Sequence, residues 1–155
     1  EGGNFWMVNN AYWIQGLSNI FDAEVVAGLE DSEEFFDKPA ESYISAMIFF
    51  PKSNHVERYE KRVLVPLGEY IPFEFCRNIA RNYGVHSSFT PGKKAKVIEG
   101  RSLPYGLSIC YEETYGHLMR DNRLEGAEML VNITNDFWYP NSRLPKQRFD
   151  HARLR

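Results

Sequence analysis

The segment "LPYGLSICYEETYGHLMRDNRLEGAEMLVNIT", residues 103–134, decides the fold, because it contains two strand-like runs around one helix-like run. Residues 103–110 are a short apolar run and predict a strand. Residues 111–126 predict a helix that Gly126 closes, and residues 127–134 predict a second strand. This order is typical of an α/β layered fold in which helices cover the sheets.

The segments on either side continue the alternation of helix and strand patterns. In chain order they predict a helix at 7–20, a buried strand at 23–29, an acidic loop at 30–42, a strand at 43–51, an extended stretch at 62–72, a helix at 73–83, a loop or hairpin at 87–102, a loop at 135–145 and a helix at 146–155.

Composition limits the function classes. The chain has 155 residues, is 43% hydrophobic and carries a net charge of -3, which fits one globular domain. Its basic residues are scattered, so we expect no nucleic-acid partner. No apolar run is long enough for a membrane span, and the start does not resemble a secretory signal. The two cysteines have no metal-ligand spacing, so we expect neither a metal nor another cofactor.

Cys110 lies where the first of the two strands passes into the helix. Backbone N–H groups at a helix start favour negative charge, and the amide of the next residue, Tyr111, can donate to a developing oxyanion. This placement suits a nucleophile. Buried free cysteines that only fill space are also common, and the local sequence leaves both interpretations open.

Glu112 and Glu113 follow the cysteine closely. Carboxylates make a neighbouring thiol a weaker nucleophile unless a cation offsets them, so a catalytic Cys110 needs a positive group from elsewhere. None of the four histidines has the neighbours expected of a catalytic base. Lys61 precedes an apolar stretch that contains Glu69, and the spacing is compatible with a buried charge network around Cys110.

Three strings carry a family resemblance: "YEKRVLVPLGEYIP" (59–72), "ICYEETYG" (109–116) and "TNDFWYPNSRLPKQRFDHARLR" (134–155). In this order they resemble the apolipoprotein N-acyltransferase branch of the nitrilase (carbon–nitrogen hydrolase) superfamily. The resemblance is good over 57–155 and loose over 1–56. It implies a nitrilase-like α-β-β-α layered sandwich. We expect the domain of residues 1–155 to be partial and incomplete at both ends.

The resemblance also implies a Glu-Lys-Cys triad. By the match, Cys110 is the nucleophile, Lys61 supports the oxyanion, and Glu1 accepts the proton. Glu1 is the only acidic residue in a suitable place, and the alternative is that it merely marks where an excerpt begins. Other positions that match functional residues of the family are Glu69, Tyr111 and Glu112 around the triad and Trp138 in a lipid-facing loop.

The implied reaction moves an acyl chain from a phospholipid, through a thioester on the cysteine, to the N-terminal amine of a diacylglyceryl-cysteine apolipoprotein. The implied location is the bacterial inner membrane, with this domain facing the periplasm and anchored by segments outside this chain. Two alternatives stay open: a soluble nitrilase-type amidase with the same triad, and a non-catalytic nitrilase-like binding module.

Overall fold

The computed structural model describes residues 3–35, 38–73, 88–136 and 141–154. One sheet contains β1 (Val25–Phe35), β2 (Lys38–Phe49) and β3 (Val56–Glu60), which are antiparallel and adjacent in chain order. The register places Gly28 opposite Ala46 and Ser45 opposite Glu60. This sheet therefore ends directly before Lys61.

The other sheet contains β4 (Val97–Ile98), β5 (Tyr105–Ile109) and β6 (Met129–Ile133). β4 and β5 are antiparallel, whereas β5 and β6 are parallel. The parallel pair is joined by a 3-10 helix, η1 (Cys110–Thr114), and by α3 (Gly116–Leu124). The carboxyl end of β5 consequently leads straight into Cys110.

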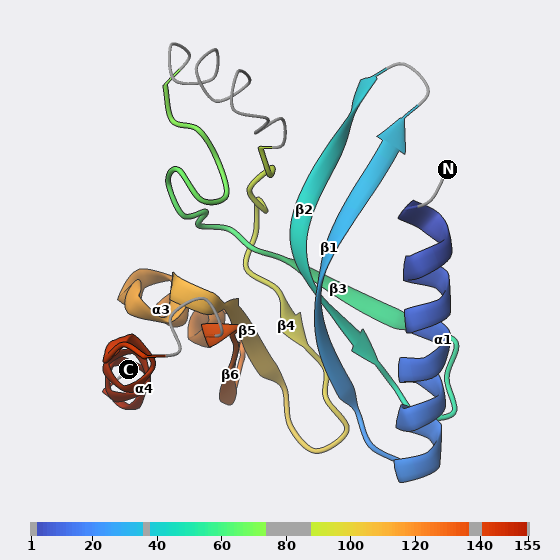
Figure 1. Ribbon diagram of the computed structural model, residues 1–155. Helices are drawn as coiled ribbons and strands as arrows, with labels where there is room; N and C mark the ends of the chain where they lie inside the picture. Colours follow the sequence, from blue (N-terminus) through green and yellow to red (C-terminus); the bar gives the residue numbers. More distant parts are fainter. Residues whose placement is uncertain (1–2, 36–37, 74–87, 137–140, 155) are drawn as a thin grey trace.

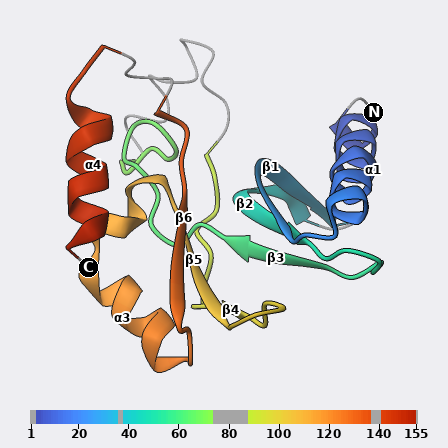
Figure 2. The ribbon, with the colours of Figure 1, turned by 90° about the horizontal axis from the view of Figure 1, so that it is seen from below.

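The two sheets pack against each other and enclose the main hydrophobic core (Figure 2). Ala46 and Ile48 of the first sheet meet Ile98 and Leu107 of the second, all without solvent exposure. α1 (Gly3–Phe21) lies beside the first sheet (Figure 1), and α3 and α4 (Leu144–Arg153) lie beside the second. The layers follow each other as helix, sheet, sheet, helix.

The contact between α3 and β5 requires a residue without a side chain at position 106. A Cβ atom on Gly106 would lie 2.5 Å from the Cβ of Asn122, which is closer than carbon atoms approach in folded proteins. Asn122 is buried and donates through its Nδ2 to the carbonyl oxygen of Leu107 at 3.1 Å. α3 is thus fixed against the strand that carries the cysteine.

The predicted strand–helix–strand order around Cys110 is confirmed, as are the helices near both ends. The predicted helix at 111–126 is divided, because η1 ends at Thr114 and α3 begins at Gly116. The predicted acidic loop at 30–42 is wrong for residues 30–35 and 38–42, which belong to β1 and β2 and pair with each other. β3 was not predicted. The predicted helix at 73–83 lies almost wholly outside the described residues.

Candidate active site

Cys110 occupies a sharp turn between β5 and η1. Its φ of 54° is in the left-handed region, which non-glycine residues adopt rarely and at an energetic cost. The thiol is free and half-buried. Strained positions of this kind persist where surrounding contacts impose them, and they are common at functional sites.

A cavity of about 660 Å³ opens beside this turn. Cys110, Lys61 and Glu69 all line it, although they come from three separate segments. The apolar part of its wall consists of Leu29, Ile44, Val65, Phe89, Ile109 and Ile133. The cavity therefore combines a thiol, an ammonium group and a carboxylate with a surface that suits hydrocarbon.

Lys61 follows β3 directly and its side chain is fully buried. Its backbone N–H donates to the carbonyl of Ile44 at 2.8 Å, and its own carbonyl accepts from Gly92 at 2.8 Å. Its ammonium group is paired with Glu69. The second oxygen of Glu69 accepts the N–H of Val65 at 2.8 Å, so both partners are held in place.

Glu112 is fully buried and accepts hydrogen bonds from both sides of the site. One oxygen accepts the backbone N–H groups of Arg62 at 2.6 Å and Val63 at 3.0 Å, directly after Lys61. The other accepts the N–H of Ile109 at 2.8 Å and the hydroxyl of Tyr59 at 2.9 Å. Glu112 thus joins the lysine segment to the cysteine turn.

The hydroxyl of Tyr59 stays protonated in this arrangement. Burial raises the pKa of Tyr59 above its ordinary value, and the negative charge of Glu112 raises it further. A protonated phenol donates to the carboxylate instead of repelling it. The expected charge network is therefore only partly correct: Lys61 pairs with Glu69, whereas Glu112 is satisfied by uncharged donors.

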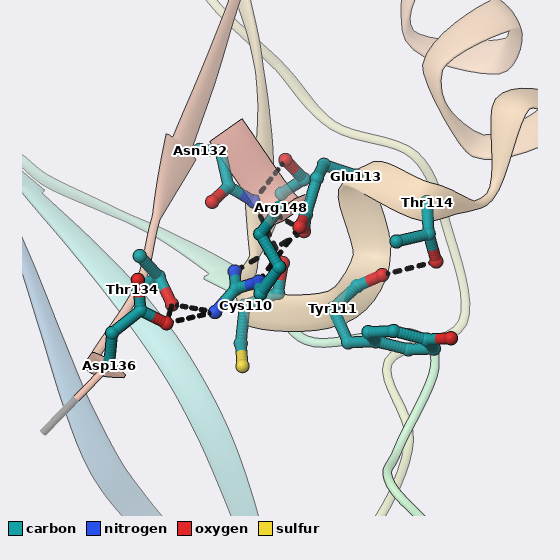
Figure 3. A network of polar contacts seen from close by, with 9 residues as sticks. Cys110, Tyr111, Glu113, Thr114, Asn132, Thr134, Asp136 and Arg148 are labelled. Atoms are coloured by element: carbon teal, nitrogen blue, oxygen red, sulfur yellow. Dashed lines mark hydrogen bonds and ion pairs between the residues drawn. The ribbon is translucent and has the colours of Figure 1, made fainter. Parts of the chain in front are cut away.

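Glu113 forms a second buried network (Figure 3). Its carboxylate accepts from Nε of Arg148, on α4, at 2.9 Å and from Nη2 at 3.4 Å. The same guanidinium reaches Thr134 and Asp136 on its other side. This ion pair connects the turn after Cys110 to α4.

Asn132, on β6, supports the cysteine turn from the same side. Its Nδ2 donates to the carbonyl oxygen of Cys110 at 3.1 Å, to Oγ of Ser108 at 3.0 Å and to Glu113 at 3.4 Å. Neither Asn132 nor Arg148 was predicted from the sequence as part of the site. An asparagine in a strand and an arginine in a charged helix carry no local signal that would distinguish them.

The other predicted site residues have different outcomes. The Tyr111 side chain is exposed and packs edge-on against the ring of Tyr115, away from the sulfur of Cys110 (Figure 3). Glu1 and Trp138 lie outside the described residues, so their predicted roles stay predictions. Within the described ranges, no group of three metal-ligating side chains occurs and no helix has the length and hydropathy of a membrane span.

Comparison with known proteins extends this description. The family "Carbon-nitrogen hydrolase" matches residues 9–155. The chain belongs to the carbon-nitrogen hydrolase family. The match also covers most of the N-terminal region, where the sequence resemblance was loose.

Two relatives within this family are apolipoprotein N-acyltransferases. The one from Chlamydia caviae is 45% identical over 96% of this chain, and the one from Chlamydia pneumoniae is 40% identical over 100% of it. The chain spans only 28% and 29% of the length of these proteins.

A solved carbon-nitrogen hydrolase from Helicobacter pylori G27 matches with a TM-score of 0.67 at 21% identity. The match covers 98% of this chain and 48% of that one. The fold is thus that of part of a nitrilase-superfamily domain.

Proposed function

We propose that this chain is part of the catalytic domain of an apolipoprotein N-acyltransferase, with Cys110 as its nucleophile. The observation that carries the proposal is that Cys110, Lys61 and Glu69 line one cavity in a chain that is 45% identical to such an enzyme. The proposed residues of the site are Glu1, Lys61 and Cys110 as the triad, Glu69, Tyr111 and Glu112 as supporting residues, and Trp138 as a lipid contact.

The first step forms a thioester. The carboxylate of Glu1 takes the thiol proton, and the sulfur of Cys110 attacks the ester carbonyl of a phospholipid. The ammonium group of Lys61 and the backbone N–H of Tyr111 stabilise the oxyanion. When the C–O bond breaks, the leaving oxygen takes the proton from Glu1 and lysophospholipid departs.

The second step transfers the acyl chain to an amine. The N-terminal amine of a diacylglyceryl-cysteine polypeptide attacks the thioester, a C–N bond forms and the C–S bond breaks. The proton lost by the amine returns to the sulfur, which restores the free thiol. No cofactor is needed. The apolar wall of the cavity supports an acyl substrate, since it gives the hydrocarbon a surface away from water.

The site of Lys61 supports its proposed role. Oxyanion donors act most strongly when they are fixed and shielded from water. The side chain of Lys61 is fully buried, and Glu112 binds the two backbone N–H groups that follow it. We propose that Glu112 is a positioning residue that keeps this ammonium group beside the cavity. We further propose that the full-length protein is attached to the bacterial inner membrane and that this domain lies in the periplasm.

The decisive experiment incubates the full-length protein with phospholipid that carries a labelled acyl chain. We expect the label on Cys110 as a hydroxylamine-sensitive adduct, followed by transfer to a diacylglyceryl-cysteine peptide. The Cys110→Ala variant should lose both reactions, whereas Cys76→Ala should keep both. Transfer at the normal rate by Cys110→Ala would refute the proposal. Release of labelled fatty acid to water alone would indicate a hydrolase, and no label at all would indicate a binding module.

A further inference from the structure

We propose that Asn132 is a positioning residue that directs the backbone N–H of Tyr111 at the oxyanion formed in the cavity. The inference rests on the proposed function, because it takes Cys110 as the nucleophile and this N–H as an oxyanion donor. Asn132 lies on β6 and is not among the residues that line the cavity, so it does not touch substrate. Its effect passes through the backbone of the cysteine turn.

One hydrogen bond connects Asn132 to this turn. Its Nδ2 donates to the carbonyl oxygen of Cys110 at 3.1 Å. That carbonyl and the N–H of Tyr111 belong to the same peptide unit, which is planar and trans, so the two groups point in opposite directions. A side chain that holds the carbonyl therefore also sets the direction of the N–H.

The direction set in this way suits an oxyanion donor. Figure 3 shows the sulfur of Cys110 and the amide of Asn132 on opposite sides of the turn. The N–H of Tyr111 points away from the carbonyl that Asn132 holds, and so toward the side on which the sulfur lies. An oxyanion on a carbon bonded to that sulfur forms on this side, where a fixed donor stabilises it.

The turn needs such a contact because its backbone is strained. The φ of Cys110 is 54°, in the left-handed region that non-glycine residues adopt rarely. Rotation of the peptide unit between Cys110 and Tyr111 relaxes a turn of this kind and swings the N–H away from the sulfur. Strained conformations persist only where surrounding contacts impose them, and the hydrogen bond from Asn132 is one of these contacts.

Asn132 is itself held from two directions. On β5, Ser108 is its partner in the parallel register, and Oγ of Ser108 lies 3.0 Å from Nδ2. From η1, the carboxylate of Glu113 accepts from Nδ2 at 3.4 Å and is in turn bound by Arg148 at 2.9 Å. A backbone carbonyl and a carboxylate only accept, so the NH2 group of the amide must face them. This fixes the orientation of the amide.

The test compares two reactions of Cys110 in the full-length protein at one pH. Thioester formation from phospholipid with a labelled acyl chain passes through an oxyanion, whereas alkylation by iodoacetamide displaces iodide at a saturated carbon and does not. Mass spectrometry of the peptide that contains Cys110 separates both products from those of Cys76. Asn132→Ala should slow thioester formation about 10–100-fold, as expected when one oxyanion donor is misdirected, and should leave the rate of alkylation nearly unchanged.

The matched control is Asn122→Ala. Asn122 is another asparagine whose Nδ2 donates to a backbone carbonyl of β5, that of Leu107, at 3.1 Å. It holds α3 and has no contact with the peptide unit after Cys110 among the hydrogen bonds of the described residues. Asn122→Ala should therefore keep the normal ratio of the two rates, even where it lowers stability.

A purely structural role of Asn132 predicts that Asn132→Ala slows both reactions alike, and the lack of any role predicts that it slows neither. Either result would overturn the inference. If Asn132→Ala does not fold, Asn132→Leu keeps the shape of the side chain without a donor and must show the same selective loss. The proposed function fails separately, if the unmodified protein forms no thioester at Cys110.

Discussion

Tyr59 donates a hydrogen bond of 2.9 Å to Glu112, and both side chains are buried. Glu112 also accepts the N–H of Ile109, which precedes the cysteine, and that of Arg62, which follows the lysine. One carboxylate thus joins the segment of Lys61 to the turn of Cys110. Four donors to one carboxylate compensate the loss of water around it.

Glu112→Gln should lower the free energy of unfolding by about 1–3 kcal/mol, because an amide nitrogen would face N–H groups that need an acceptor. Urea denaturation measures the change. Glu125→Gln is the matched control on an exposed residue and should stay within about 0.5 kcal/mol of the unmodified protein. Equal stability of the two variants would contradict the role of Glu112.

The stability of the protein should fall at alkaline pH through Tyr59. The folded protein holds the pKa of this phenol above the ordinary value of 10.0, so the unfolded chain ionises first as the pH rises. Stability from this group is complete below about pH 10 and is lost above it, by about 1.4 kcal/mol per pH unit. Urea denaturation at increasing pH should show that the free energy of unfolding declines less steeply in Tyr59→Phe than in the unmodified protein. Equal declines in the two proteins would disprove the effect.

Cys110→Gly should be more stable than Cys110→Ala by about 1 kcal/mol, whereas the proposed function predicts that neither variant transfers an acyl chain. Glycine adopts the observed φ of 54° without the steric cost that any Cβ imposes. The extra entropy of glycine in the unfolded chain offsets part of this gain. Thermal unfolding of the two variants measures the difference. Higher stability of the alanine variant would show that the turn is not strained.

Lys61→Met should reduce the rate of thioester formation by about 10²–10³-fold, as expected when one oxyanion donor is lost. Single-turnover labelling with a phospholipid measures this rate. The matched control is Lys52→Met, whose side chain is 74% exposed and does not line the cavity. Lys52→Met should form the thioester at the normal rate. A comparable loss of rate in this variant would indicate a non-specific effect of removing a positive charge.

Two glycine substitutions should have opposite effects on stability. Gly106→Ala should destabilise the protein by about 1–3 kcal/mol, because the new Cβ overlaps Asn122. Gly16→Ala, within α1, meets no atom within 4 Å and should stabilise it by about 0.5–1 kcal/mol. Thermal unfolding tests both. Tolerance of alanine at position 106 would show that α3 can move away from β5.

Much of the site could be predicted because its signals are local. The apolar run of residues 105–109 ends directly before Cys110. Glu112 follows two residues after the cysteine, in the same 3-10 helix. The charge pattern indicated Lys61 and Glu69, the family resemblance supported both, and the fold places them in the same cavity. These positions depend on short segments whose local structure follows from their own residues.

The errors have a common physical origin in tertiary context. The stretch at 30–42 is rich in acidic residues, which are depleted in strands, yet β1 and β2 extend through it because their backbones pair. Arg148 belongs to a helix of mostly polar residues and resembles its exposed neighbours. Only the packing of α4 against η1 buries it beside Glu113, and no pattern within the helix contains that information.

Arg148 follows Glu113 by 35 residues, so translation supplies the carboxylate well before its counter-ion. A nascent chain that has just emerged with Cys110 still lacks the guanidinium and the helix that carries it. The polar network that supports the cysteine turn can therefore close only after the segment that forms α4 has been synthesised.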